Sequence, residues 1–176
     1  QAGFADVRVA AVADVDPERL ATTLDGLAKL GHKAKGVADF REILDDPGID
    51  SVGIATPDHW HTPIALMALK AGKHVYVEKP CSHNIHEGNL LRAAAAKTGL
   101  CVQHGTQSRS GQGIKAGVQF MRDGGIGKVR FAKAINHQLR APIGRAPESD
   151  PPAGVDYDMW TGPAPLRPFT ENRWHY

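Results

Sequence analysis

The sequence is poor in cysteine and has no long hydrophobic run. Only two of its 176 residues are cysteines, Cys81 and Cys101, and they do not form a CxxC motif. A disulfide framework and a zinc site built on thiolates are therefore not expected. No apolar stretch approaches the ~20 residues that a helix needs to cross a bilayer. We therefore expect no membrane-spanning segment.

Charge of one sign is not concentrated anywhere in the chain. Lys and Arg number 21 and Asp and Glu number 19, which gives a formal net charge of +2. Nucleic-acid-binding proteins carry a basic patch or stripe, whereas the basic residues here are scattered. Nucleic acid is therefore not an expected partner.

What the chain does contain is an alternation of short apolar segments with helical segments. Valine-rich runs predict buried strands at 7–16, 50–57, 73–80 and 100–107. Caps, prolines and glycine stops predict helices at 16–31, 39–48, 61–72 (with Pro63 in its first turn), 85–99 and 110–125. Such alternation is typical of βαβ units, so we predict an α/β protein with a doubly wound parallel sheet.

The residues that follow each strand are the first to consider for function, because ligands of such sheets bind beyond the carboxyl ends of the strands. Asp14 and Asp16 end the first strand. An acid there accepts hydrogen bonds from ribose hydroxyls, and Asp14 is the better candidate because Asp16 also suits a helix cap. The GxGxxG turn of a dinucleotide site is absent. We expect the sequence to begin just after that turn, with residues 1–9 as the tail of the following helix.

The second strand end reads ATPDHWH (55–61), and Pro57 stops the strand. It brings Asp58, His59 and His61 to the predicted ligand edge. The His-x-His pair suggests a metal, but no third ligand has a persuasive spacing, so no metal site is expected.

The third strand end delivers Glu78, Lys79 and Pro80 in a row. A Glu-Lys pair before a proline can be a simple solvated turn. The functional interpretation is that Pro80 holds the backbone of Lys79 extended, so that its side chain has a fixed direction. A partly desolvated lysine can then act as a proton donor or electrostatic clamp on a hydroxyl or carbonyl.

The last strand end, VQHGTQSRS (102–110), is rich in hydrogen-bonding side chains. Gln107 and Arg109 can bind a polyhydroxylated or anionic ligand, and Gly105 allows close approach. His104 can be a general acid or base, or simply a structural donor.

The pattern changes near Gly125. Residues 125–140 resemble a longer strand, and seven of the twelve prolines then lie between Ala141 and Phe169. We interpret residues 1–123 as one domain, incomplete at its start, and residues 124–176 as the beginning of a second.

Five motifs together carry a resemblance that spans nearly the whole chain. VADVDPER, ATPDHWH, AGKHVYVEKP, VQHGTQSR and GGIGKV occur in the order and spacing of the Gfo/Idh/MocA oxidoreductases, named after glucose–fructose oxidoreductase and inositol dehydrogenase. The tail from Gly154 resembles a bacterial branch of dehydrogenases, many of them exported by twin-arginine signals. The resemblance leaves the location open between the bacterial cytoplasm and the periplasm.

The resemblance implies a fold, a cofactor and roles for individual residues. It implies a Rossmann domain lacking its first strand and glycine-rich loop, followed by the start of an α+β domain with an open, mainly antiparallel sheet. It implies NAD, or alternatively NADP, and a homo-oligomer when full length. The implied cofactor contacts are Asp14, Thr56, Pro57, Asp58, His61, Glu78, Lys79 and Gln107. Lys79 is also the implied catalytic residue, and the implied substrate contacts are Arg109, Trp160 and Arg167.

Three functions remain open on this basis. The first is hydride transfer between nicotinamide and a hydroxyl-bearing carbon of a sugar, inositol or related polyol. The second is an NAD-dependent glycosidase that oxidises the sugar transiently and eliminates the glycosidic group. The third is a non-catalytic nucleotide- or sugar-binding module, or an inactive fragment, since the catalytic pair of the second domain would lie beyond Tyr176.

Overall fold

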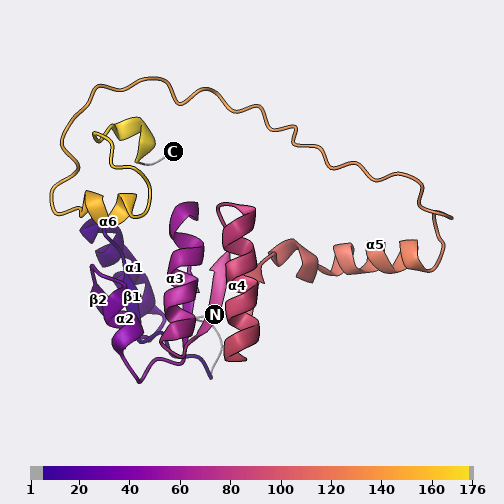
Figure 1. Cartoon of the computed structure of the whole chain (residues 1–176), viewed down its shortest axis with the longest axis horizontal. Coiled ribbons are helices and arrows are strands. Elements are labelled where there is room, and N and C mark those ends of the chain that lie inside the picture. The colour runs from indigo at the N-terminus through magenta and orange to yellow at the C-terminus, as the bar shows by residue number, and fades with distance from the viewer. Residues whose placement is uncertain (1–5, 175–176) are drawn as a thin grey trace.

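The protein is a parallel α/β structure, and the computed structural model describes residues 6–174. Figure 1 labels the helices and the first two strands. In chain order they are β1 (Ala11–Ala13), α1 (Pro17–Lys29), β2 (Lys35–Val37), α2 (Arg41–Asp45), β3 (Ser51–Ile54), α3 (Asp58–Lys70), β4 (His74–Glu78), α4 (Ile85–Thr98), β5 (Val102–Gly105), the 3-10 turn η1 (Gln107–Ser110), α5 (Gln112–Arg122), α6 (Tyr157–Thr161) and the 3-10 turn η2 (Glu171–Arg173).

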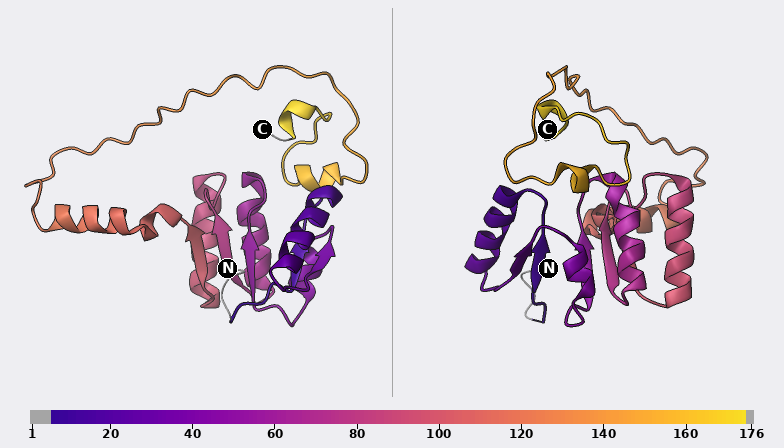
Figure 2. Two further views of the ribbon diagram at one scale, coloured as in Figure 1. Left: turned by 180° about the vertical axis from the view of Figure 1, so that it is seen from behind. Right: turned by 60° about the vertical axis from the view of Figure 1, so that its left-hand side comes forward.

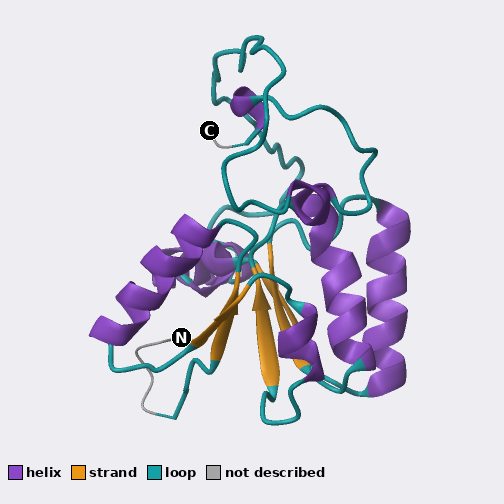
Figure 3. Cartoon of the chain, turned by 90° about the vertical axis from the view of Figure 1, so that its left-hand side faces the viewer, coloured by secondary structure: helices purple, strands orange, loops and turns teal. Residues whose placement is uncertain are grey.

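The strands form two parallel sheets. β1 pairs with β2 in one sheet, and the other has the order β3-β4-β5. Val12 lies opposite Gly36, Val52 opposite Val75, and Val77 opposite His104. Helices lie on both sides of the strands (Figure 3). The predicted α/β class is therefore confirmed, although the expected single sheet is divided in two.

Several predicted boundaries differ from the observed ones. β2 was not predicted. α3 begins at Asp58, with Pro57 as its N-cap, so the expectation that Pro63 lies in the first turn is wrong. The expected helix tail at residues 1–9 lies partly outside the described residues, and Val7 to Ala10 lead into β1 without helical structure. Within the described chain, residues 125–140 also form no hydrogen-bonded strand.

Most of the buried core belongs to the larger sheet. Buried apolar side chains of α2, β3, α3, β4 and α4 form one cluster, namely Leu44, Ile54, Ile64, Ala65, Ala68, Leu69, Val75, Val77 and Leu91. α4 is held at both ends: Asn84 accepts a hydrogen bond from the Glu87 N–H, and Gly99 ends the helix at a positive φ of 68°. By contrast, α1 has no buried residue.

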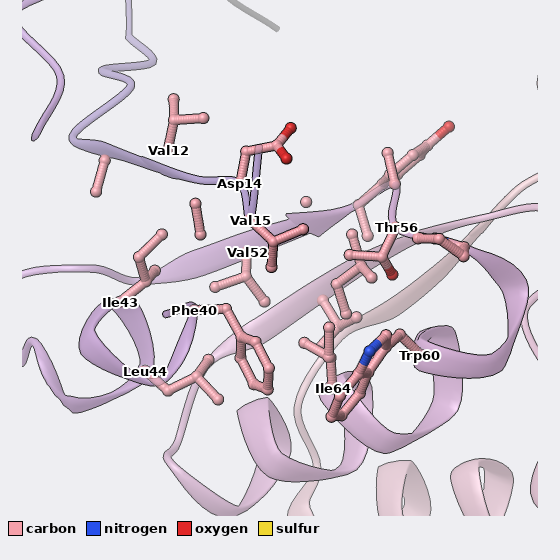
Figure 4. Close-up of a pocket in the computed structure, with 18 of the residues that line it drawn as sticks. Val12, Asp14, Val15, Phe40, Ile43, Leu44, Val52, Thr56, Trp60 and Ile64 are labelled. Atoms are coloured by element: carbon pink, nitrogen blue, oxygen red, sulfur yellow. The ribbon is translucent and has the colours of Figure 1, made fainter. Parts of the chain in front are cut away.

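A cavity of about 1880 Å³ separates the two sheets, with residues of β1 on one side and of β3 on the other. Figure 4 shows Val12 and Val15 facing it together with Phe40, Ile43 and Val52. The Asp14 N–H donates to the Val37 carbonyl oxygen, and the Lys35 N–H donates to the Ala10 carbonyl oxygen. In a parallel ladder every second residue bonds to the same neighbouring strand. The N–H and C=O groups of Ala11 and Ala13 therefore point away from β2, toward the cavity. Both β1 and β3 are edge strands that border this cavity.

The segment after β5 leads away from the sheets and then comes back to them; its last part, residues 156–174, is called the returning segment below. α5 projects from the body, and a long loop leads back to α6 (Figures 1 and 2). α6 meets the start of α3, where the Trp60 Nε1–H donates to the Met159 carbonyl oxygen at 2.8 Å and His59 Nε2 lies 2.9 Å from the Trp160 carbonyl oxygen. Among the helices of residues 6–174, none is long and apolar enough to span a membrane.

Candidate cofactor and substrate site

The strands within each sheet are parallel, and the strands of both sheets point the same way (Figure 3), so the strand-end residues lie at one edge of the molecule. Asp14 follows β1, Thr56 follows β3, Glu78 ends β4, and Gln107 lies just beyond β5. Of the predicted site residues, five line the large cavity: Asp14, Thr56, Pro57, Asp58 and Trp160. The remaining six lie outside its lining: His61, Glu78, Lys79, Gln107, Arg109 and Arg167.

Asp14 and Asp16 have different surroundings. The Asp16 carboxylate accepts hydrogen bonds from the N–H groups of Glu18 and Arg19 and so caps α1. The Asp14 carboxylate accepts one backbone bond, from the Asp16 N–H at 3.0 Å, and points away from the apolar side chains of the cavity (Figure 4). Asp14 therefore keeps lone pairs available for a ligand, whereas Asp16 serves the helix, as its role as a cap predicted.

Two buried polar atoms at the strand ends have no hydrogen-bond partner within residues 6–174: Thr56 Oγ1 after β3 and His104 Nε2 in β5. Leaving a buried donor or acceptor unpaired costs about 1–3 kcal/mol, so such groups are rare in proteins. These two lie on the strands that flank β4, next to the Lys79 turn.

Both oxygens of the Glu78 carboxylate accept hydrogen bonds from nearby residues. One carboxylate oxygen accepts a hydrogen bond from Gln107 Nε2 at 2.5 Å, and the other accepts from the Lys79 N–H at 3.1 Å. Gly105 makes room for this contact, because a Cβ there would lie 3.2 Å from both the Glu78 Cα and its Oε2. Glu78 therefore orients the turn and Gln107.

Lys79 is exposed, and its ammonium group has no hydrogen bond or ion pair with any residue that the structure describes. The peptide bond between Lys79 and Pro80 is cis. Lys79 thus places a free cation at the end of β4, the central strand of the larger sheet. The sequence predicted this position for Lys79, directly after the strand that ends at Glu78.

His61 is placed differently from its predicted role. It is 1% exposed. Its Nδ1 lies 2.6 Å from the Pro80 carbonyl oxygen and its Nε2 lies 2.7 Å from the Thr56 carbonyl oxygen. Both ring nitrogens are thus engaged with the backbone, and neither faces the cavity.

Of the remaining predicted residues, the two arginines are exposed and Trp160 is half-buried. Arg109 is exposed on η1. Arg167 is exposed beside a separate hollow with Glu148 and Tyr157. Trp160 stacks on Tyr157, with ring centroids 5.6 Å apart and planes 16° apart.

The cavity wall includes residues that the sequence did not single out. Met159, Arg173 and Trp174 line it from the returning segment, and Trp60 lines it from α3. Trp60 and Met159, which are joined by a hydrogen bond, are separated by 99 residues in sequence. No periodic pattern marks such a contact, so only the folded chain identifies them.

Within the described residues, no three His, Cys, Asp or Glu side chains form a group that could hold a metal ion. His59 and His61, the pair considered above, both have their Nε2 atoms at carbonyl oxygens.

Comparison with known proteins identifies the family. Residues 1–106 match the GFO_IDH_MocA family, described as an oxidoreductase family with an NAD-binding Rossmann fold. The chain belongs to the Gfo/Idh/MocA oxidoreductase family. The predicted resemblance and Rossmann-type fold are confirmed by this match, which ends at the strand-end loop of β5.

Named relatives fall into two groups. The chain is 30% identical over 118 residues to levoglucosan dehydrogenase of Pseudarthrobacter phenanthrenivorans, covering 67% of this chain and 29% of that protein. It is 33% identical over 141 residues to a glycosyl hydrolase family 109 protein of Saccharopolyspora erythraea, covering 76% and 30% respectively.

Among solved structures, the apo scyllo-inositol dehydrogenase of Lactobacillus casei superposes with a TM-score of 0.63 at 27% identity, covering 71% of this chain and 36% of that one. The chain thus spans about a third of the length of these relatives. What it contains is mainly their nucleotide-binding part, since the family match covers residues 1–106.

The described residues fit part of an NAD site. Asp14 offers a carboxylate at the strand end where a ribose is held in this fold. The unpartnered Thr56 Oγ1 offers a hydroxyl, and the same cavity borders both residues. A glycine-rich cradle for the pyrophosphate is not among residues 6–174.

Proposed function

We propose that the intact protein transfers hydride between NAD and a hydroxyl-bearing carbon of a sugar, inositol or related polyol. The observation that carries the proposal is the free ammonium group of Lys79 at the end of β4, between two strand ends that each carry an unpartnered buried polar atom. The relatives named levoglucosan dehydrogenase and scyllo-inositol dehydrogenase support this class of substrate.

The residues of this chain would divide the work as follows. When bound, the nicotinamide accepts the hydride, which is the difficult chemical step. The Asp14 carboxylate would accept hydrogen bonds from ribose hydroxyls. The Lys79 ammonium group would stabilise the negative charge that develops on the substrate oxygen as the hydroxyl proton leaves. Glu78, held by Gln107, would keep the Lys79 turn in place.

The proposal favours NAD over NADP. An acid at the strand end repels the 2′-phosphate of NADP and binds the free ribose hydroxyls of NAD. Arg19, the nearest candidate for binding a phosphate, is already 3.7 Å from the Asp16 carboxylate. Replacing Asp14 by Ala should therefore weaken NAD binding more than NADP binding.

The decisive experiment is Lys79→Ala in the intact protein. We expect kcat on a polyol panel to fall roughly a hundredfold at saturating NAD, because a preorganised charge at the reacting oxygen is lost. Lys97→Ala is a matched control, since Lys97 is an exposed lysine in the last turn of α4. Turnover by Lys79→Ala equal to that of the control would contradict the assigned role.

A second function has one specific observation in its favour, the relative named as a glycosyl hydrolase family 109 protein. In this version NAD stays bound, the sugar is oxidised transiently, and the glycosidic group is eliminated. Release of an aryl group from an aryl glycoside without net NADH formation would select it. Binding of NAD with turnover of neither substrate class would instead favour a binding module.

Two further features remain predictions. The first is the domain boundary predicted at residues 123/124; α5 ends at Arg122, and the chain beyond residue 128 is mostly exposed and without regular structure up to residue 150. We infer that residues 124–176 open the substrate domain, and that the intact protein is a homo-oligomer. Light scattering of the intact protein would test the second inference.

A further inference from the structure

Residues 154–165, called the bridge below, extend from the start of α1 to the start of α3. The bridge begins beside α1, because a Cβ on Gly154 would lie 3.2 Å from Cγ of Pro17, the first residue of that helix. The right-hand view of Figure 2 shows α6, which lies within the bridge and is drawn in yellow-orange, between the ends of α1 and α3. The bridge therefore spans the two halves of the molecule at their strand ends.

The other contacts of the bridge are with the first turn of α3. The Trp60 Nε1–H donates to the Met159 carbonyl oxygen at 2.8 Å. His59 Nε2 lies 2.9 Å from the Trp160 carbonyl oxygen. Gly162, with a φ of 54°, packs so closely on the indole of Trp60 that a Cβ there would overlap the ring. Three contacts thus fix this part of the bridge to α3.

The bridge is also held by contacts of its own. The Asp156 carboxylate accepts a hydrogen bond from the Met159 N–H at 2.8 Å and so caps α6. The Tyr157 ring meets the ring of Phe169, which is 6% exposed, at a centroid distance of 5.3 Å. The shape of the bridge is therefore set without a ligand, and little conformational entropy is lost when a ligand binds against it.

Both ends of the bridge lie beside candidate cofactor contacts. Pro17 follows Asp14 by three residues, and His59 follows Thr56 by three residues. Asp14 and Thr56 border the same cavity, and the proposed function places the ribose of NAD at Asp14. The bridge thus crosses the molecule at the end of the cavity where that ribose is placed.

The part of the bridge that lines the cavity is apolar. Pro163, Ala164 and Pro165 line the cavity and are exposed, and the half-buried Met159 lines it as well. Of the bridge residues that the structure describes, those in the cavity lining carry no charge. An adenine base has flat faces that gain free energy when they leave water for such a surface. This wall therefore suits a neutral base better than a phosphate.

The positions of Asp14 and Lys79 separate the two halves of the cofactor. Asp14 follows β1 and lies at the cavity between β1 and β3, whereas Lys79 follows β4 and lies outside the cavity lining. In the proposed function, Lys79 acts at the reacting oxygen. A dinucleotide that extends from Asp14 to Lys79 therefore has its adenosine half beside the bridge and its nicotinamide half at β4.

We propose that the bridge is the outer wall of the nucleotide site and covers the adenosine half of NAD, with Trp60 and Gly162 as positioning residues that hold this wall in place. The inference rests on the ribose-binding role proposed for Asp14, but not on hydride transfer. The wall slows the release of NAD, because the cofactor leaves only when the bridge parts from α1 or α3.

The test is to open the bridge in the intact protein and to measure the affinity for each half of the cofactor. Gly162→Ala places a Cβ within the Trp60 ring and strains the backbone, so that the bridge must move. Ligand-observed NMR titrations with ADP-ribose and with nicotinamide mononucleotide report on the two halves separately. We expect the Kd of ADP-ribose to rise roughly tenfold, because apolar contacts with the adenine are lost. The Kd of nicotinamide mononucleotide should not change.

Gly127→Ala is the matched control. Gly127 has a φ of 69°, comparable with that of Gly162, but within the described chain a Cβ there would meet nothing within 4 Å. The control therefore carries the backbone strain and leaves the bridge closed. Equal affinity of the two variants for ADP-ribose would overturn the proposal. Tighter binding by Gly162→Ala would also overturn it, because the bridge would then obstruct the site.

A milder variant guards against a general loss of folding. Trp60→Phe removes the Nε1–H that donates to Met159 but keeps an aromatic ring against Gly162. We expect the Kd of ADP-ribose to rise roughly threefold, because one of the hydrogen bonds that hold the wall is lost. Stopped-flow displacement of NADH by excess NAD should show faster release in both variants. A release rate equal to that of the wild type in both would contradict retention by the wall.

This inference and the proposed function fail separately. If the affinity for ADP-ribose depends on the bridge while Lys79→Ala leaves turnover unchanged, the wall stands and the proposed function fails. If the intact protein turns over a polyol while Gly162→Ala and Gly127→Ala bind ADP-ribose equally, the proposed function stands and the wall is rejected.

Discussion

The two sheets of this protein are built from similar βα units but are packed very differently. Around β3, β4 and β5, the helices bury Ile64, Ala68 and Leu91 against the strands. Around β1 and β2, α1 buries no residue, and all of β1 is only half-buried. β1 and β3 are both edge strands, so the contrast comes from the helices that cover the strands: a parallel strand is buried only where the helices beside it contribute buried apolar side chains.

The largest expected contrast is between two leucine truncations. Leu69→Ala, in α3, removes a side chain that is 3% exposed, and should cost about 2–5 kcal/mol. Leu24→Ala, in α1, removes a half-buried one and should cost less than about 1 kcal/mol. Denaturant unfolding of the intact protein measures both. Equal losses would show that α1 belongs to the same core.

The next contrast concerns the strand edges that border the cavity. The backbone N–H of His74 donates to the Asp50 carbonyl oxygen. Because bonding alternates along a parallel strand, the N–H and C=O groups of Ser51 and Gly53 point away from β4. Those of Ala11 and Ala13 point away from β2 in the same way. A parallel apolar strand supplied between β1 and β3 would pair with both edges.

Hydrogen exchange tests this arrangement. With such a strand added, we expect the Ala13 and Gly53 amides to exchange on the order of a hundredfold more slowly. The Val77 amide, in the central strand β4, is the internal reference. Unchanged exchange at Ala13 and Gly53, with the strand bound, would mean that the two sheets do not join.

The smallest contrast is between two glycines. A Cβ at Gly105 would lie 2.9 Å from the Tyr76 hydroxyl and 3.2 Å from the Glu78 Cα, whereas one at Gly36 would meet the flexible end of Leu24 at 2.7 Å. Gly105→Ala should cost about 1–3 kcal/mol, because the backbone of β4 cannot yield easily. Gly36→Ala should cost less, because Leu24 can change rotamer. A larger cost at Gly36 in thermal unfolding would reverse the order.

Much of the fold follows from local sequence signals. Asp16 and Pro17 at the start of α1, and Asn84 and Gly99 around α4, act as the sequence predicts. β2 was missed because three residues that include Gly36 are too few to show a period. The start of α3 was placed too late because Pro63 resembles a first-turn proline, although Pro57 already ends the strand.

The sequence predicted at which edge of the sheets the site lies, but not which side chains contact one another there. The rule that ligands lie beyond parallel strands placed Asp14, Thr56 and Lys79 correctly at the strand ends. The rule does not say which side chains turn inward. His61 therefore appeared to be a ligand contact until its two carbonyl partners were seen.

The docking of α6 onto α3 has an optical consequence. All three tryptophans of the sequence gather at that junction: Trp60 donates to the Met159 carbonyl oxygen, and the Trp160 ring lies 5.3 Å from that of Trp174. Intrinsic fluorescence therefore reports on this junction and, through Trp60, which packs against the core cluster, on the edge of the apolar core. Detachment of the returning segment will change the emission while the far-ultraviolet dichroism of α3 and α4 persists, so the protein carries its own probe of that contact.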